Sequence, residues 1–362
     1  MAEGKNLVGV DIGASSIKVC QLKETRKGYS LVRLGYAELP PQAIVDGRVV
    51  KPSVVVDALG RALTSAKVKQ REVALSVSGQ AVIIRKITVP LMTAAELEEQ
   101  ILWEAEQHIP FDIKDVHVDY EVLRRRPESG QMDLLLVAAK RDEVNEYVQI
   151  ARAAKLKPLV VDVDAFTVQN VFEWNRSIPS DQTLAIINSG ASLTSVNILA
   201  RGASAFTRDI ASAGTYVTEQ IQRQLGVSFE QAEAFKLAAS QGFVPVSERL
   251  PGARDLPPEV PQILETVSDS IAGEVQRSLD FFLATSGEPE LQRIYLAGGS
   301  SNLTALAFAL GRRARVPVEV IQPLERIHIE AKEVDPTLAS KLGGQLCVAV
   351  GLAMRKEAEK RA

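Results

Sequence analysis

Cysteine and histidine are scarce in this sequence, which argues against a disulfide framework or a metal centre. The 362 residues include only two cysteines, Cys20 and Cys347, which lie far apart in apolar stretches. The three histidines, His108, His117 and His328, lack the paired spacing that zinc sites use. We therefore expect two buried, reduced thiols and no histidine-based zinc site.

The sequence also lacks a long apolar run and a large excess of charge of either sign. No stretch reaches the roughly 18 apolar residues that a membrane-spanning helix needs, and Asp11 interrupts the apolar start that a signal peptide would require. Lysine plus arginine number 42 against 45 aspartate plus glutamate, a formal net charge of −3, so no overall positive field attracts nucleic acid. We expect a soluble, cytoplasmic chain that inserts into no membrane and binds no nucleic acid.

Length and an internal repeat both indicate two domains. Single hydrophobic cores stop growing at roughly 250–300 residues, and this chain is longer. Two sets of three strands are expected, at 7–12, 16–22 and 29–38 and at 184–188, 193–199 and 203–208. Gly13-Ala14-Ser15 in the first set and Gly190-Ala191-Ser192 in the second are 190 − 13 = 177 positions apart, each between an apolar strand and a returning strand. This pattern predicts an internal duplication.

The rest of the chain has a mixed α/β pattern. Further strands are expected at 72–78, 82–89, 117–123, 133–139, 159–163, 294–297 and 318–321. Helices are expected at 94–108, 142–154, from about 165, at 213–225 (ended by Gly226), 229–239, 262–285, 303–311 and 340–356. Segment 245–261 contains five prolines and is expected to be a loop. The order of elements predicts an α/β fold with an inserted subdomain between the two repeats.

A turn of small residues between two antiparallel strands offers several backbone N–H groups to an anion. The turn Gly13–Ser16 meets this requirement, although Asp and Gly also occur at such turns for purely conformational reasons. Asp11 precedes the turn and could orient water around a divalent ion bound to phosphate, while Lys18 could add a charged contact. The first repeat therefore contains a candidate phosphate-binding turn.

Further candidate nucleotide contacts occur in the second half. The turn Asn188–Thr194 repeats the first one. Gly298–Ser301 lies between a strand and the helix that follows, where it could bind a phosphate or a base or could only cap the start of the helix. Glu233 and Lys236 lie three apart on one helix face and could bind ribose hydroxyls or form a solvated ion pair. The predicted nucleotide-binding residues are Asp11, Gly13, Ala14, Ser15, Ser16, Lys18, Asn188, Gly190, Ala191, Ser192, Thr194, Glu233, Lys236, Gly298, Gly299 and Ser300.

These motifs together resemble the superfamily of actin, heat-shock proteins and sugar kinases. The resemblance matches the phosphate-1 motif to Val10–Lys18, the phosphate-2 motif to Asn188–Thr194 and the adenosine motif to Leu296–Asn302. It implies a duplicated actin-like (ribonuclease H-like) fold, with a nucleotide cleft between domains 1–165 and 166–362 and a helical and loop subdomain at about 213–290. It also implies ATP or ADP with Mg²⁺ as cofactors, with Asp11 reaching the metal through water.

Within this superfamily, the stretches Trp103–Asp112 and Asp119–Leu123 resemble the PilM family of type IV pilus assembly proteins. That family is similar to FtsA in having a relocated inserted subdomain, here about 79–160. The resemblance implies a cytoplasmic, ATP-binding adaptor that the N-terminal tail of PilN holds at the inner membrane. It also implies contacts with other inner-membrane components of the pilus machine and a possible ring-like oligomer in the assembled machine. We expect the tail in a groove between 79–160 and the first strands, and we expect Trp103 and Phe111 to be core residues rather than anchors.

One departure and two alternatives qualify this interpretation. The phosphate-2 motif usually begins with Asp, but this chain has Asn188, so we expect ATP hydrolysis to be slow, dependent on a partner or absent, and we assign no catalytic residue. An FtsA-like division protein would need an amphipathic C-terminal helix, whereas residues 355–362 have no apolar face. A small-molecule kinase would need a carboxylate base, for which Asp164 is the candidate, although we expect a structural role for it.

Overall fold

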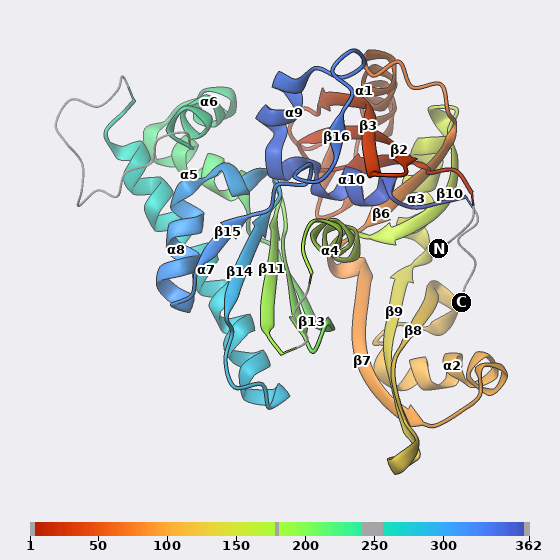
Figure 1. The fold of residues 1–362 in the computed structure, drawn as a ribbon. Coiled ribbons are helices and arrows are strands. Elements are labelled where there is room, and N and C mark those ends of the chain that lie inside the picture. The colour runs from red at the N-terminus through yellow and green to blue at the C-terminus, as the bar shows by residue number, and fades with distance from the viewer. Residues whose placement is uncertain (1–3, 178–180, 241–255, 358–362) are drawn as a thin grey trace.

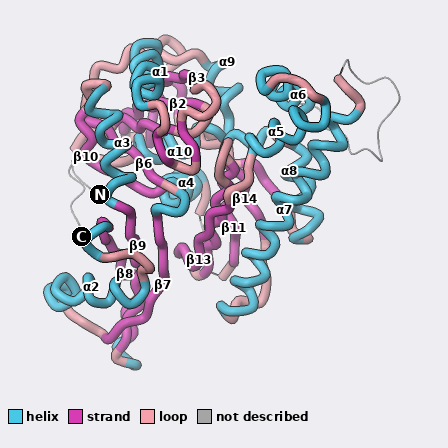
Figure 2. Tube along the Cα trace, turned by 180° about the vertical axis from the view of Figure 1, so that it is seen from behind, coloured by secondary structure: helices cyan, strands magenta, loops and turns pink. Residues whose placement is uncertain are grey.

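A computed structural model describes residues 4–177, 181–240 and 256–357 of the chain. Two main sheets lie side by side, each with helices on its outer face (Figures 1 and 2). The first sheet contains β1 (Val8–Ile12), β2 (Ser16–Thr25), β3 (Gly28–Glu38), β6 (Glu72–Val77), β10 (Lys157–Val163) and β16 (His328–Ile329). The second sheet contains β11 (Thr183–Ser189), β12 (Thr194–Ala200), β13 (Ala203–Ile210), β14 (Arg293–Ala297) and β15 (Val318–Val320).

The two main sheets repeat one topology. The first has the order β10-β6-β1-β2-β3-β16 and the second the order β15-β14-β11-β12-β13, so that each has a three-stranded meander followed by two parallel strands. Val10 faces Val19 in the first meander, and Ile187 faces Val196 in the second, at positions 177 apart in both cases. The predicted duplication is therefore confirmed, down to the pairing of single residues.

The inserted segment forms its own small sheet beside the first half. Its strands β7 (Val82–Pro90), β9 (Gln131–Lys140) and β8 (Val116–Arg126) pack one face against helix α2 (Ala94–His108). Thr93 begins α2 with a reciprocal capping box in which Glu96 is the partner, a strong local signal for a helix start. Figure 1 places this sheet and α2 away from the helices of the second half.

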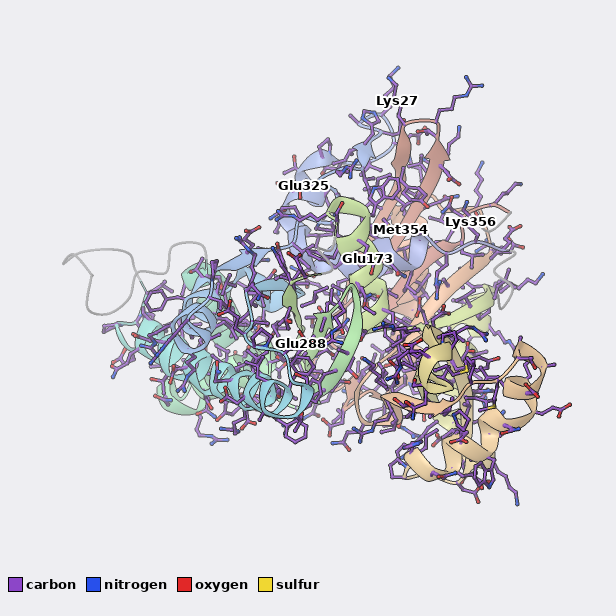
Figure 3. All side chains as sticks on the ribbon, turned by 60° about the horizontal axis from the view of Figure 1, so that its bottom comes forward. Lys27, Glu173, Glu288, Glu325, Met354 and Lys356 are labelled. Carbon is purple, nitrogen blue, oxygen red and sulfur yellow. The ribbon has the colours of Figure 1, made fainter. Side chains whose placement is uncertain are left out.

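Helices complete the layers around the two main sheets. Outside the first sheet lie α1 (Pro52–Ser65) and α3 (Arg141–Ala153), and outside the second lie α5 (Gly214–Leu225), α7 (Glu259–Ser286) and α8 (Thr304–Ala314), with α6 (Phe229–Ser240) beside them. Lys27 lies at the far tip of the β2–β3 hairpin, and Glu288 lies beyond the end of α7 (Figure 3). Among the described helices, none is long and apolar enough to cross a membrane.

Two helices form the centre of the molecule between the main sheets. α4 (Asp164–Asn175) and α10 (Cys347–Ala353) share a core with strands of both halves. A Cβ built on Gly351 would lie 2.1 Å from the Thr167 carbonyl oxygen of α4, and one built on Gly9 of β1 would lie 2.1 Å from the Ala349 oxygen. Only glycine permits approaches this close, so Gly351 lets α10 lie directly against α4, and Gly9 lets α10 lie directly against β1.

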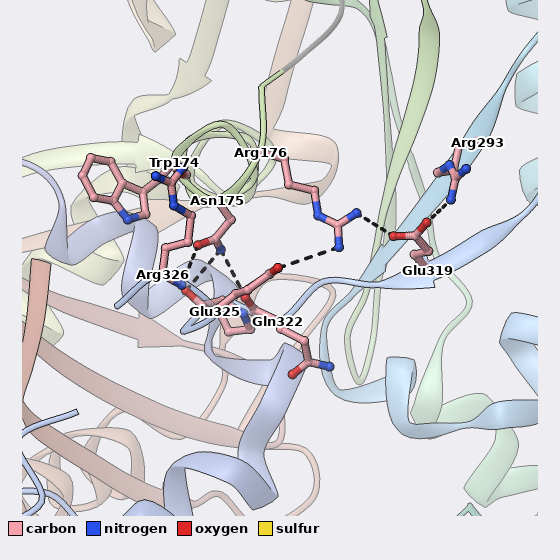
Figure 4. Close-up of polar contacts among 9 residues, drawn as sticks. Trp174, Asn175, Arg176, Arg293, Glu319, Gln322, Glu325 and Arg326 are labelled. Carbon is pink, nitrogen blue, oxygen red and sulfur yellow. Dashed lines mark hydrogen bonds and ion pairs between the residues drawn. The ribbon is translucent and has the colours of Figure 1, made fainter. Parts of the chain in front are cut away.

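A polar network ties α4 to the segment that returns from the second half to the first (Figure 4). The Asn175 amide donates to the Gln322 carbonyl at 3.1 Å and accepts from the Arg326 N–H at 3.2 Å. Arg176 pairs with Glu319 at 2.6 Å and with Glu325 at 3.7 Å. The two chain segments that cross between the halves are thus joined to each other.

Most predicted elements are present, with four differences. No element was predicted for α1, although Pro52 at its start and the buried stripe Val55, Leu59 and Ala62 carry the usual signals of a helix. The expected helix 340–356 is broken into α9 (Pro336–Leu342), a short 3₁₀ turn and α10, because Gly343 has φ +49°. The expected loop 245–261 is wrong at its end, where α7 begins at Glu259, and its residues 245–255 lie outside the described residues.

The fourth difference concerns an aromatic side chain. Trp103 was expected in the core but is 63% exposed, because it lies on the outer face of α2 while Leu97, Ile101 and Ala105 are the buried residues of that helix. Phe111 does pack against the α2 core, with the Lys140 ammonium 4.4 Å from its ring centre. Both cysteines are buried and free, as expected, and burial raises the pKa of the Cys347 thiol to about 12.

Candidate functional site

The turn of the first repeat is built as the sequence predicted. The Gly13 N–H donates to the Ser16 carbonyl oxygen at 3.1 Å, which closes the turn between β1 and β2. Asp11 and Lys18 face each other across these strands and form an ion pair of 3.2 Å, with both side chains almost buried. The Lys18 ammonium lies 3.4 Å from the place that a Cβ of Gly13 would occupy, so any side chain there would fill the space beside the charge.

The turn of the second repeat has the same construction. The Gly190 N–H donates to the Leu193 carbonyl at 2.8 Å, and the Thr215 N–H donates to the Ala191 carbonyl at 2.8 Å. Thr194 donates its hydroxyl to the Ser212 carbonyl at 2.8 Å, which fixes the turn to the start of α5. Ser192 is partly buried in this turn, as are Ala14 and Gly13 in the first turn, while Ser15 is exposed.

The third small-residue segment lies directly against the second turn. Gly298 has φ +86°, and a Cβ there would lie 2.3 Å from the Ser189 carbonyl oxygen and 2.7 Å from Oδ1 of Asn188. Ser300 donates its hydroxyl to the Gly190 carbonyl at 2.7 Å. The structure thus brings Asn188, Gly190, Gly298 and Ser300 together, and Gly299 follows at the start of a 3₁₀ turn.

Glu233 and Lys236 belong to the same site and are not a solvated surface pair. The Lys236 ammonium lies 2.7 Å from Glu233 and donates to the Gly214 carbonyl at 3.2 Å and to the Thr218 hydroxyl at 2.9 Å. Burial lowers the pKa of Lys236, although the Glu233 charge opposes this effect. A Cβ on Gly214 would lie 2.8 Å from the Ser300 hydroxyl and 3.7 Å from the Lys236 ammonium, so this glycine keeps the space between the two groups open.

A buried carboxyl group, Asp164, lies where the two halves meet. It is the first residue of α4, close enough to Asp11 of β1 and Asp209 of β13 for both charges to act on it. Burial, assisted by the Asp11 charge, raises the pKa of Asp164 to about 7, although hydrogen bonds from the Ser76 and Ser78 side chains oppose the rise. The sequence offered Asp164 as the candidate base of a kinase but favoured a structural role, and the structure places it near Asp11, which precedes the turn of the first repeat.

Replacing Asp164 by asparagine should make the protein more stable at high pH. Because its pKa is raised from 3.8 to about 7, the folded chain retains a proton between these values that the unfolded chain has lost, so stability falls as pH rises through this window. We expect Asp164→Asn to exceed wild type by about 3 kcal/mol at pH 8 and to match it near pH 4.5, measured by urea unfolding. The control is Asp57→Asn on the exposed face of α1, which should change neither value. Parallel pH profiles for wild type and Asp164→Asn would contradict the prediction.

Tyr36 is a residue of this site that sequence reasoning missed. It faces Lys18 across the β2–β3 pair, and the Ser16 side chain hydrogen-bonds to its hydroxyl. Burial raises the pKa of Tyr36, and the charges of Glu38 and of Glu233 in the second half raise it further. Counting back along the β2–β3 hairpin from the Thr25–Gly28 pair places Tyr36 opposite Ile17, and it is a bulge between Gln21 and Leu22 that moves Tyr36 opposite Lys18.

The arrangement suits a polyphosphate nucleotide. Two turns offer N–H groups, and Lys18 and Lys236 supply positive charge. Gly13 and Gly214 leave space beside these two ammonium groups, where a side chain would block a ligand. Within the described residues, no group of three or more His, Cys, Asp or Glu side chains could hold a metal ion directly.

Comparison with known proteins identifies a family. The model of the family described as Type IV pilus assembly protein PilM matches residues 9–357. A solved structure described as the PilM–PilN type IV pilus biogenesis complex contains a chain 28% identical to this one, with a TM-score of 0.84 over 98% of this chain and 99% of that chain.

Two more distant structures share the fold. The ethanolamine utilization protein EutJ from Carboxydothermus hydrogenoformans is 14% identical, with a TM-score of 0.53 over 96% of this chain and 89% of that one. MreB5 of Spiroplasma citri bound to ADP is 12% identical, with a TM-score of 0.52 over 96% of this chain and 94% of that one. The predicted duplicated, actin-like α/β fold is confirmed.

Proposed function

Because this chain belongs to the family of type IV pilus assembly proteins named PilM, we propose that it is an ATP-binding scaffold of the pilus machine that holds the cytoplasmic N-terminal tail of a PilN-like membrane protein. The observation that supports the nucleotide part is that Gly190, Ser300 and Lys236 converge around the space that Gly214 leaves open. The partner part is supported by the solved complex of a 28% identical chain.

The nucleotide lies between the two halves in this proposal. The phosphates bind at the turns 13–16 and 188–194, with Lys18 as a charged contact, and Glu233 and Lys236 bind the ribose. Bound Mg²⁺ would neutralise phosphate charge, held by Asp11 through water. Asn188 carries no charge and cannot act as a base, so hydrolysis is slow, partner-dependent or absent.

The proposal divides the chain at residue 165 into two actin-like domains. The first includes the inserted subdomain of about 79–160, and the second includes the helical and loop subdomain of about 213–290. This division is supported by the separate core of α2 and its three strands and by the repeated order of the two main sheets. The protein lies on the cytoplasmic side of the inner membrane, attached through its partner and in contact with other pilus components, in a ring-like assembly.

A cavity of about 400 Å³ is the place that we assign to the partner's tail. One wall is the start of β7 and the other is formed by β12, β13 and Phe281 of α7, so it lies against the second meander rather than the first, where sequence reasoning placed the groove. β7 and β13 are edges of their sheets, so each has a side without a strand partner among the described residues. An extended peptide can pair with such an edge and place alternate side chains on an apolar floor, here formed by Val82, Ile83, Ile84, Val196 and Phe206.

The proposal is tested by titrating the protein, loaded with Mg²⁺ and ATP, with a peptide of the PilN-like tail from the same organism. We expect saturable binding, and repeating the titration with ADP or without nucleotide measures how far nucleotide alters it. Absence of binding by folded, ATP-loaded protein would overturn the partner part. Absence of ATP binding would overturn the nucleotide part.

The position of the tail is tested by replacing Phe281, which is 58% exposed at the cavity, with aspartate. We expect peptide affinity to fall about 10-fold or more, because an apolar contact is lost and a charge is placed at the peptide. The control is Phe308→Asp on α8, which is 46% exposed and outside the cavity lining, and it should bind the peptide as wild type does. Equal affinities for both variants would place the tail elsewhere.

A further inference from the structure

The outer face of α2 has an apolar centre and an acidic rim. Leu102 and Trp103 are 51% and 63% exposed, although large apolar side chains of this kind are mostly buried. Glu99 and Glu106 lie one helical turn before and after them on the same face, because residues three or four apart are neighbours on a helix. The helix contains five glutamates, none of them buried, and no lysine or arginine. This face therefore suits a partner that is both apolar and positively charged.

Helix α8 in the second half exposes a face of the opposite charge. Phe308 lies exposed at its centre, with the Arg312 guanidinium of the next turn 6.0 Å from the ring centre. Arg313 and Arg315 follow, both exposed, and α8 itself contains no acidic residue. Asp269 of α7 pairs with Arg312 at 2.6 Å and with Arg313 at 2.8 Å, so it balances one of the three positive charges. The remaining charge is positive and lies beside an exposed aromatic ring.

These two faces complement each other but cannot meet within one molecule. Figures 1 and 2 place α2 and α8 on opposite sides of the protein. Pairing of α2 with a second α2 would bring acidic rims together, and pairing of α8 with a second α8 would bring arginines together, so like charges oppose both symmetric contacts. Only the contact between α2 of one copy and α8 of another joins opposite charges.

We propose that the outer face of α2 binds the outer face of α8 of a second copy of this chain, with Leu102 and Trp103 against Phe308 and the glutamates beside the arginines. Burial of the apolar side chains supplies affinity, and the charges set the orientation of the two copies. Each copy in such a pair still has one unused face, so the contact can be repeated from copy to copy. The inference deepens the ring-like assembly of the proposed function, on which it rests.

The first test measures self-association of the full chain by sedimentation velocity over a series of protein concentrations at low salt. Wild type should form dimers and larger species as its concentration rises. Trp103→Asp and Phe308→Asp should each weaken association by about 10-fold or more, because each places a charge at the apolar centre of the contact. The control is Val50→Asp, at a position just before α1 that is 55% exposed, and it should associate as wild type does.

The second test reverses the charges of each face separately. One variant carries Glu99→Lys with Glu106→Lys, and the other carries Arg312→Glu with Arg315→Glu. Each should be monomeric alone, because its altered face meets a face of the same charge. An equal mixture should associate again, since the lysines of one variant meet the glutamates of the other and the two unchanged faces still match. Circular dichroism establishes that each variant is folded, and a merely misfolded variant would not be rescued by mixing.

The outcomes separate this inference from the rest of the proposed function. Wild type that stays monomeric would overturn the inference and leave the two faces to other partners. Full association of Trp103→Asp or Phe308→Asp, or a mixture of the charge-reversed variants that stays monomeric, would show that α2 and α8 do not bind each other. Binding of ATP and of the PilN-like tail is measured by separate titrations, which Trp103→Asp and Phe308→Asp should leave unchanged. Failure of those titrations in wild type would instead overturn the proposed function.

Discussion

Gly351→Ala is expected to lower the free energy of unfolding by about 3 kcal/mol or more and the thermal midpoint by roughly 4 °C or more. The new Cβ would lie 2.1 Å from the Thr167 carbonyl oxygen and 2.6 Å from its carbonyl carbon, which are backbone atoms of α4. Backbone cannot move aside as a side-chain end does, so α4 and α10 must separate. Because both helices share a core with the two main sheets, the separation disturbs the packing between the halves.

The matched control for this substitution is Gly60→Ala, in the middle of α1. A Cβ on Gly60 would have no neighbour within 4 Å, and alanine is favoured over glycine inside a helix by roughly 0.5–1 kcal/mol. Gly60→Ala should therefore be slightly more stable than wild type. Calorimetry of wild type, Gly351→Ala and Gly60→Ala measures the predicted loss of stability in the first variant and the small gain in the second. A Gly351→Ala protein as stable as wild type would show that the central helices are not tightly packed.

Gly298→Ala is expected to reduce ATP affinity by about 100-fold or more, a loss of about 3 kcal/mol in binding free energy. Alanine at φ +86° is strained, and its Cβ would lie 2.3 Å from the Ser189 carbonyl oxygen. Relief of this contact moves the third small-residue segment away from the second turn and breaks the 2.7 Å hydrogen bond from Ser300 to Gly190. The two walls of the nucleotide site in the second half then no longer meet.

Gly202→Ala is the control that shows whether backbone strain by itself, without damage to the nucleotide site, lowers ATP affinity. Gly202 also has a positive φ, of +79°, but a Cβ there would have no neighbour within 4 Å. This variant should bind ATP with wild-type affinity and lose only about 1 kcal/mol of stability. Circular dichroism establishes that both variants are folded, and fluorescence titration with a labelled ATP gives the affinities. Wild-type affinity in folded Gly298→Ala would place the nucleotide away from this segment.

Local sequence signals were sufficient wherever one strand or helix decides the structure. The duplication was visible because Gly13 and Gly190 follow apolar strands at a constant offset, and the meanders follow from the alternation and the turns. The capping box at Thr93 marks α2, and Gly226 ends α5 with φ +64°. These features depend on residues close together in the sequence, so their chemistry can be recognised without the fold.

Features that depend on distant segments were harder to predict. Trp103 was expected in the core because a large aromatic side chain is buried more often than not, but only the packing of α2 on its sheet decides which face is covered. The helix 340–356 was expected to be continuous, but the chain turns at Gly343, whose φ is +49°, and Gly344 then lies so near Ser301 that a Cβ there would be 2.5 Å from its hydroxyl. The missed α1 is different, since its signals were present in the sequence and were not used.

The sequence by itself determined the α/β class, the duplicated halves and the two turns Gly13–Ser16 and Gly190–Leu193, because strand periodicity and turn chemistry are local. Only the tertiary structure decided that Lys236 is buried against Gly214 and that Asp164 lies near Asp11 with a pKa raised to about 7. The burial of these side chains and the charges that act on them come from residues far apart in the chain. These residues come together only when the two halves pack around α4 and α10.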